Sequence, residues 1–90
     1  MKRALFSIII PTLNEEKFLP RLLDSLVAQS DKNFEVIVVD GSSRDKTVTV
    51  AKKYTAKLPS LKIIQVKKPS LPLQRNLGAK AAKGDWFVFV

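Results

Sequence analysis

The sequence is short and basic. Its 90 residues carry 16 Lys and Arg against 8 Asp and Glu, a net charge of +8, and 46% of them are hydrophobic. This length suits one small domain, and the charge favours anionic partners such as nucleic acids, acidic lipids or phosphorylated substrates. The absence of Cys and His excludes disulfides, thiol nucleophiles, Cys/His zinc sites and imidazole acid–base chemistry. Because the basic residues are scattered along the chain, we favour a solvated lysine-rich surface over a nucleic-acid face.

The first predicted element is a core strand over residues 6–10. Lys2 and Arg3 ahead of this apolar run resemble the start of a signal peptide. However, the run is short, meets Pro11 and is not followed by a small-residue cleavage site. No apolar segment in the sequence approaches the ~20 residues that a membrane-spanning helix needs.

Three further apolar runs predict strands, namely VIVV (36–39), LKIIQV (61–66) and WFVFV (86–90). The runs at 6–10, 36–39 and 86–90 lack the alternation of a half-solvated sheet. They are near-continuous and rich in β-branched or aromatic residues, as expected for strands covered on both faces.

Helical spacing predicts a helix between each pair of strands. The first covers residues 15–30, with Asn14 as its N-cap and Pro20 near its start. Its predicted apolar face consists of Phe18, Leu22, Leu23, Leu26 and Val27. The second covers about 45–57, with Ser43 as its cap and Asp45 in its first turn. Its predicted inner face consists of Val48, Ala51, Tyr54 and Thr55.

The third predicted helix covers residues 71–84, with Pro72 at its start and Gly84 as its C-cap. The order is therefore βαβαβαβ. Strands that alternate with helices predict a parallel sheet with right-handed crossovers. We predict a Rossmann-like three-layer α/β/α half-domain with strand order 3-2-1-4, in which ligands bind at the carboxyl ends of the strands.

Polar segments follow the first three strands, PTLNEE after the first, DGSSRD after the second and KKPSLPLQRN after the third. All three should meet at the carboxyl edge of the sheet. Asp40 ends a buried strand, and two interpretations stay open. It could belong to the turn, where Gly41 would adopt a conformation that other residues avoid, or it could accept hydrogen bonds from a base or a ribose.

Glu15 and Glu16 suit a helix start, where acids are expected for electrostatic reasons alone. Arg75 lies in the first turn of the third helix, whose N-terminus should point toward the same crevice. A guanidinium beside free backbone N–H groups makes a reasonable diphosphate site. The glycine-rich motifs of dinucleotide-binding and P-loop proteins are absent, and no acid follows the third strand as in a phospho-receiver domain.

Residues 6–47 and 74–90 together resemble the opening blocks of the family 2 glycosyltransferases, inverting enzymes with a GT-A fold. The resemblance implies a nucleoside diphosphate sugar lying across the carboxyl edge. By this likeness Pro11, Thr12 and Leu13 wall the base pocket with Glu15 nearby. Asp40 would contact the base or ribose, and Arg75 would reach toward the nucleotide or diphosphate. Gly41 stands where many members carry a second acid that contacts uracil, and Leu13 stands where an aromatic residue is common.

In that family a metal-binding Asp-any-Asp motif follows the block that residues 86–90 resemble, and the catalytic base lies further on. The resemblance thus implies that residues 1–90 are the N-terminal nucleotide-sugar-binding part of a longer transferase. The full-length protein would use Mg²⁺ or Mn²⁺, with ligands beyond Val90. The 90-residue chain should be inactive alone, with no catalytic or metal-binding residue of its own, and should self-associate through its last strand.

We expect a cytoplasmic location, with peripheral membrane association of the full-length protein if its acceptor is a lipid. The acceptor, the sugar and the base stay open. The main alternative is a non-catalytic α/β module that binds a nucleotide or another anion. A basic nucleic-acid binder ranks third. Steep salt dependence of binding and indifference to nucleotide sugars would distinguish it.

Overall fold

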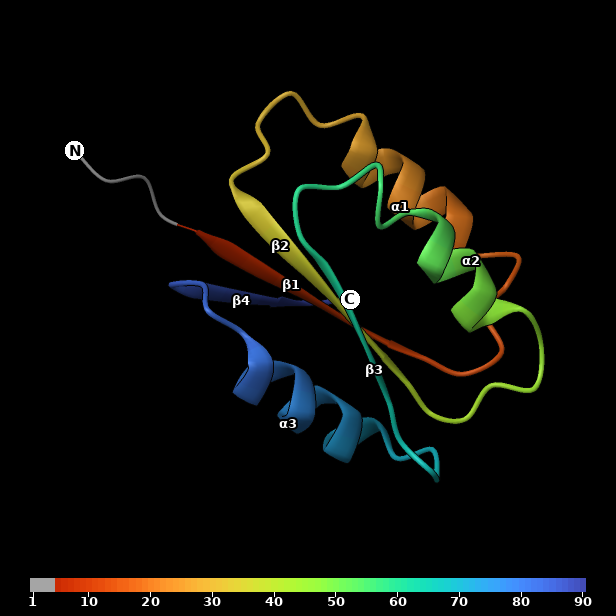
Figure 1. The fold of residues 1–90 in the computed structure, drawn as a ribbon. Helices are drawn as coiled ribbons and strands as arrows, with labels where there is room; N and C mark the ends of the chain where they lie inside the picture. Colours follow the sequence, from red (N-terminus) through yellow and green to blue (C-terminus); the bar gives the residue numbers. More distant parts are fainter. Residues whose placement is uncertain (1–4) are drawn as a thin grey trace.

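The computed structural model describes residues 5–90, so Lys2 and Arg3 lie outside the described residues. The elements run β1 (Phe6–Thr12), α1 (Leu19–Val27), β2 (Phe34–Asp40), α2 (Thr47–Lys53), β3 (Leu61–Gln65), α3 (Leu71–Ala81) and β4 (Trp86–Phe89). The strands form one parallel sheet of order β3-β2-β1-β4 (Figure 1). The predicted α/β fold class, element order and strand order are confirmed.

Helices cover both faces of the sheet. Figure 1 shows α1 and α2 on one face and α3 on the other. Between the sheet and the α1–α2 layer lies the main core, formed by Ile10, Leu19, Leu23, Phe34, Val36, Val38, Ala51, Tyr54 and Leu58. The Tyr54 hydroxyl donates to Asp24 over 2.7 Å and so ties the end of α2 to α1. Thr55, predicted to face inward, is exposed, because α2 ends at Lys53 and the chain then turns.

The strands differ in burial because their places in the sheet differ. Every residue of β2 is buried, as its continuous apolar run predicted. In contrast, all four residues of β4 are exposed. The prediction that 86–90 is covered on both faces is therefore wrong for this chain. The reason is that β4 is an edge strand, which pairs with β1 alone among the strands of residues 5–90, and α3 packs mainly over β1 and β2.

The first two helices begin later than predicted. Residues 15–18 form a turn, and α1 starts at Leu19 rather than at Glu15. Asn14 does not cap it. Asn14 has a φ of 54°, and its side-chain oxygen accepts a hydrogen bond from the amide of Arg44. Ser43 does not cap α2 either. The Asp45 carboxylate instead accepts from the backbone N–H of Thr47, the first residue of that helix.

The third helix starts as predicted, with Pro72 in its first turn. Its N-cap, which was not predicted, is Ser70. The prediction of Gly84 as its C-cap is wrong, because α3 ends at Ala81 and Gly84 has no positive φ. Gly84 serves a close approach instead. A Cβ there would lie 2.4 Å from the Ser7 hydroxyl oxygen, to which the Gly84 amide donates. None of the helices within residues 5–90 is long and apolar enough to cross a membrane.

Candidate functional site

The three loops that follow β1, β2 and β3 are joined to one another at the carboxyl edge of the sheet. The Gly41 amide donates to the Thr12 carbonyl over 2.9 Å, and the Val66 amide donates to the Asp40 carbonyl over 2.8 Å. The polar segments that were singled out in the sequence therefore lie together. Their side chains show how this edge is built.

Asp40 is fully buried at the end of β2. One oxygen of its carboxylate accepts from the Thr12 hydroxyl (2.7 Å) and the Ser43 hydroxyl (2.6 Å), and the other accepts from the Ser43 amide (2.8 Å). Asp40 thus fastens the end of β1 to the loop after β2. Of the two interpretations left open by the sequence, the role in the turn has these three hydrogen bonds as direct support.

The loop after β1 is held by side chains from the loop after β2. Three consecutive amides, those of Asn14, Glu15 and Glu16, donate to Ser43 (2.8 Å), Thr47 (2.8 Å) and Asp45 (3.2 Å). These bonds explain why residue 14 is stable with a positive φ, which Asn tolerates better than most residues. The loop is thereby fixed before any ligand arrives.

Asp45 takes part in this arrangement as an ionised group. Burial would raise its pKa, but hydrogen bonds from the hydroxyl and amide of Thr47 and from the Glu16 amide outweigh that and lower it. The carboxylate therefore keeps its charge at neutral pH and accepts from both loops.

The prediction that Gly41 adopts the unusual backbone conformation of the turn after β2 is wrong. Gly41 has no positive φ, and Ser42 adopts the left-handed conformation instead, with φ 62°. The Ser42 hydroxyl donates to the carbonyls of Val66 and Lys67 in the loop after β3. Gly41 is required for space, because a Cβ there would lie 2.8 Å from the Gln74 Oε1 and 3.0 Å from the Pro69 Cα.

A hollow of about 230 Å³ opens where these loops meet the start of α3. On one side it is lined by Pro11, Thr12, Leu13 and Glu15, and on the other by Pro69, Ser70, Leu71 and Gln74. Four of the seven predicted site residues thus line one hollow. Gly41 lies against its Gln74 and Pro69 wall, and Asp40 binds Thr12. Arg75 is exposed on α3 beside Gln74, and it is not among the lining residues.

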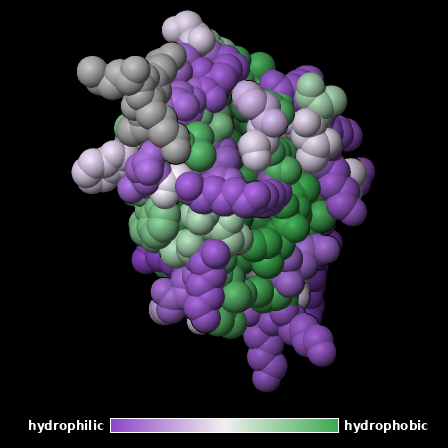
Figure 2. All heavy atoms as spheres, turned by 60° about the vertical axis from the view of Figure 1, so that its left-hand side comes forward, coloured by the Kyte–Doolittle hydropathy of each residue, from purple (hydrophilic) through white to green (hydrophobic). Residues whose placement is uncertain are grey.

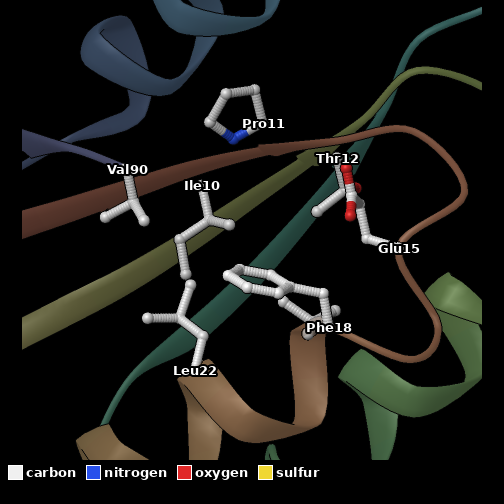
Figure 3. A pocket seen from close by; sticks show the side chains of 8 residues that line it. Ile10, Pro11, Thr12, Glu15, Phe18, Leu22 and Val90 are labelled. Carbon is white, nitrogen blue, oxygen red and sulfur yellow. The ribbon is translucent and has the colours of Figure 1, made fainter.

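A second hollow, of about 250 Å³, lies on the α1 side of β1 and shares Pro11, Thr12 and Glu15 with the first. Figure 3 shows Pro11 on one side of the β1 ribbon and Ile10, Phe18 and Leu22 on the other. The remaining walls of this second hollow are mostly apolar. Glu15 therefore borders both hollows.

Sequence reasoning missed the role of Gln74. Its carboxamide is buried and bonded to backbone groups of both β1 and β2. The spacing of Gln74 and Gly78, one turn apart, could have indicated that both lie on the inner face of α3. The partners of Gln74 could not be inferred, because they lie 62 and 35 residues away along the chain.

No group of three or more His, Cys, Asp or Glu side chains in the described part of the chain could hold a metal ion. The residues present therefore do not fit a divalent metal by themselves.

The parallel sheet of order β3-β2-β1-β4, with helices on both faces and a hollow at the carboxyl ends of β1 and β3, is a doubly wound type of α/β fold. Residues 7–90 match the family model of Glycosyl transferase family 2, and the chain belongs to this family. The predicted resemblance is thereby confirmed. A similar curated protein is the poly(ribitol-phosphate) β-N-acetylglucosaminyltransferase TarS of Staphylococcus aureus. It is 42% identical over 91 residues, which cover 94% of this chain and 15% of TarS.

Solved structures agree with this assignment. Residues 1–349 of S. aureus TarS in complex with UDP-GlcNAc align with a TM-score of 0.87 and 40% identity, covering 96% of this chain and 26% of that one. A mannosyltransferase from Pyrobaculum calidifontis in complex with GDP-Man and Mn²⁺ aligns with a TM-score of 0.84 and 25% identity, over 93% of this chain and 26% of that one. The chain thus spans a minor part of the proteins that it matches.

Proposed function

We propose that this chain is the donor-binding part of an inverting glycosyltransferase. It would bind a nucleoside diphosphate sugar, and the full-length protein would transfer the sugar to an acceptor hydroxyl. The observation that carries the proposal is the hollow beside β1, where Pro11, Thr12, Leu13 and Glu15 face the start of α3. Its support is the family match together with similarity to structures that contain UDP-GlcNAc or GDP-Man.

The walls of the hollow suggest how a donor would lie. Pro11 and Leu13 offer apolar surface to the base, while Glu15 offers carboxylate oxygens. Asp40 stays the proposed partner of the base or ribose. Its carboxylate now binds Thr12 and Ser43, so it would have to exchange one of these hydrogen bonds for the ligand. Gly41 would leave room for the Gln74 and Pro69 wall against which the donor lies. Arg75, directly after the first turn of α3, would reach toward the diphosphate, where its guanidinium favours an anion.

The chemistry of transfer needs groups that we place outside residues 1–90. An inverting transfer needs a base for the acceptor proton, and departure of the nucleotide needs its diphosphate charge neutralised. We propose that the full-length protein uses Mg²⁺ or Mn²⁺ for that neutralisation. Within this chain, the described residues would bind and orient the donor without catalysing its transfer.

Calorimetric titration of the 90-residue chain with UDP, GDP and uridine tests the proposal. We expect UDP or GDP to bind. If UDP is the ligand, Arg75→Ala should weaken it about tenfold, the loss of one charge-assisted contact, and leave uridine unchanged. Lys80→Ala is the matched control, because it removes the same charge near the far end of α3.

Equal losses of UDP affinity in the two variants would mean that nonspecific electrostatic attraction accounts for the binding. A chain that ignores both nucleotides but binds oligonucleotides, with an affinity that falls steeply with salt, would instead be a nucleic-acid binder. A full-length protein that binds UDP-sugars but transfers none would be a binding module.

A further inference from the structure

Gln74 is a buried polar side chain that fastens three elements at the candidate site. It is 3% exposed. Its Nε2 donates to the Thr12 carbonyl (3.1 Å) and the Val39 carbonyl (2.8 Å), and its Oε1 accepts from the Ser70 amide (3.0 Å). Both donors of the carboxamide are therefore used. One side chain holds the ends of β1 and β2 against the start of α3.

Gly41 leaves the space that Gln74 fills. A Cβ at position 41 would come within 2.8 Å of the Gln74 Oε1, closer than real Cβ contacts, and within 3.0 Å of the Pro69 Cα. The Gln74 carboxamide cannot move aside freely, because its hydrogen bonds are to backbone groups of the sheet. The residues at positions 41 and 74 therefore depend on each other.

This pair borders the hollow in which the donor is proposed to bind. Gln74, Pro69 and Ser70 form its α3 side, opposite Thr12 and Leu13. The carbonyl of Thr12 is itself one acceptor of Gln74, so the same side chain sets both walls. Arg75 is the next residue, so its position depends on how the start of α3 is held.

We propose that Gln74 is a positioning residue of the donor site, which sets the separation of the two walls, and that Gly41 is needed to admit it. The inference rests on the proposed function, because it takes the hollow as the donor site. A larger residue at position 41 would clash with the Gln74 and Pro69 wall that a bound base would meet.

UDP titration of the 90-residue chain tests the donor side. Gln74→Ala removes the side chain, and Gln74→Met keeps about the same volume but removes the hydrogen bonds. Both should raise the Kd for UDP about tenfold, as expected for losing these bonds. Glu35→Gln is the control, since it acts at the opposite edge of the sheet. It should lower the melting temperature and leave the Kd within about twofold, as distant sites behave independently.

A thermal double-mutant cycle tests the pair without any ligand. Gly41→Ala should lower the melting temperature of the wild-type chain, and clearly less so in the Gln74→Ala background, because the close contact with Oε1 is gone. Additive effects would overturn the coupling. Gln74 variants whose Kd for UDP changes no more than that of Glu35→Gln would overturn the positioning role. If the wild-type chain binds neither UDP nor GDP, the proposed function fails, and the role of Gln74 in donor binding fails with it. The thermal cycle still decides whether positions 41 and 74 are coupled.

Discussion

Glu35 is a buried acid at the end of the sheet opposite the candidate site. The Ser7 hydroxyl donates to its carboxylate over 2.6 Å and the Lys83 amide over 2.5 Å, and the Lys62 ammonium lies 3.8 Å away. Ser7 in turn accepts from the Gly84 amide. Glu35 therefore attaches the turn between α3 and β4 to β1 and β2, so it contributes to the fold and not to the hollow at the carboxyl edge.

The pH dependence of folding should report on Glu35. Burial raises the pKa of this carboxyl, but the bonds from Ser7 and Lys83 and the charge of Lys62 outweigh it, and the net shift is downward. A lowered folded-state pKa stabilises the fold above the unfolded value, near 4.5, and this stabilisation is lost as the pH falls through the folded value. Glu35→Gln should therefore cost about 1 kcal/mol at pH 7 and progressively less below about pH 4.5.

Thermal unfolding of both chains between pH 7 and pH 3 measures this difference. If the stability difference between wild type and Glu35→Gln stays constant across this range, the pKa of Glu35 is not lowered by folding.

At the scale of elements, the sequence predicted the strands better than the helix starts. The strands were found because their apolar runs are continuous and the pattern depends only on neighbouring residues. The helix starts were misplaced because local capping rules assigned Asn14 and Ser43 to their own helices. In the structure these two residues bond to each other's loop, 29 and 30 residues apart. Four residues of the hollow were predicted from the resemblance, whereas Gln74 was missed because its contacts are non-local.

The packing of α3 on the sheet depends on Gly78. A Cβ there would lie 2.4 Å from the Cγ2 of Ile9, a fully buried β-branched residue of β1. Helix propensity alone favours Gly78→Ala by about 1 kcal/mol. Overpacking against a rigid strand costs about 1–3 kcal/mol, so we expect a net loss of stability.

Denaturant unfolding should show this loss for Gly78→Ala, while Asn76→Ala on the exposed side of the same helix should change stability by less than about 0.5 kcal/mol. If Gly78→Ala instead stabilises the chain, α3 does not approach the sheet as closely as described.

At the scale of the whole molecule, exposed hydrophobic side chains gather at β4. Trp86 is 62% exposed, and Phe87, Val88 and Phe89 are exposed as well, next to Phe6 of β1. Figure 2, viewed from the side of Figure 1 where β4 begins, shows a hydrophobic area framed by hydrophilic residues. A long hydrophobic edge strand is a template for pairing with another chain. Burial of this exposed strand would favour association with a second copy, whereas the net charge of +8 opposes it.

We expect the 90-residue chain to self-associate by pairing of β4 with β4 of a second copy. A twofold axis makes this pairing antiparallel and joins the two sheets. The amides of Trp86 and Val90 donate to β1, so those of Phe87 and Phe89 point to the open edge. The charge of +8 on each copy opposes the contact, and added salt should therefore strengthen it.

Light scattering over a concentration series at low and high salt measures this association. Phe87→Pro removes one outward amide without breaking the ladder to β1, and Phe87→Ala is its control, because it loses the ring but keeps the amide. Association should weaken more in the proline variant, and a chain that stays monomeric at high concentration and high salt would contradict edge pairing.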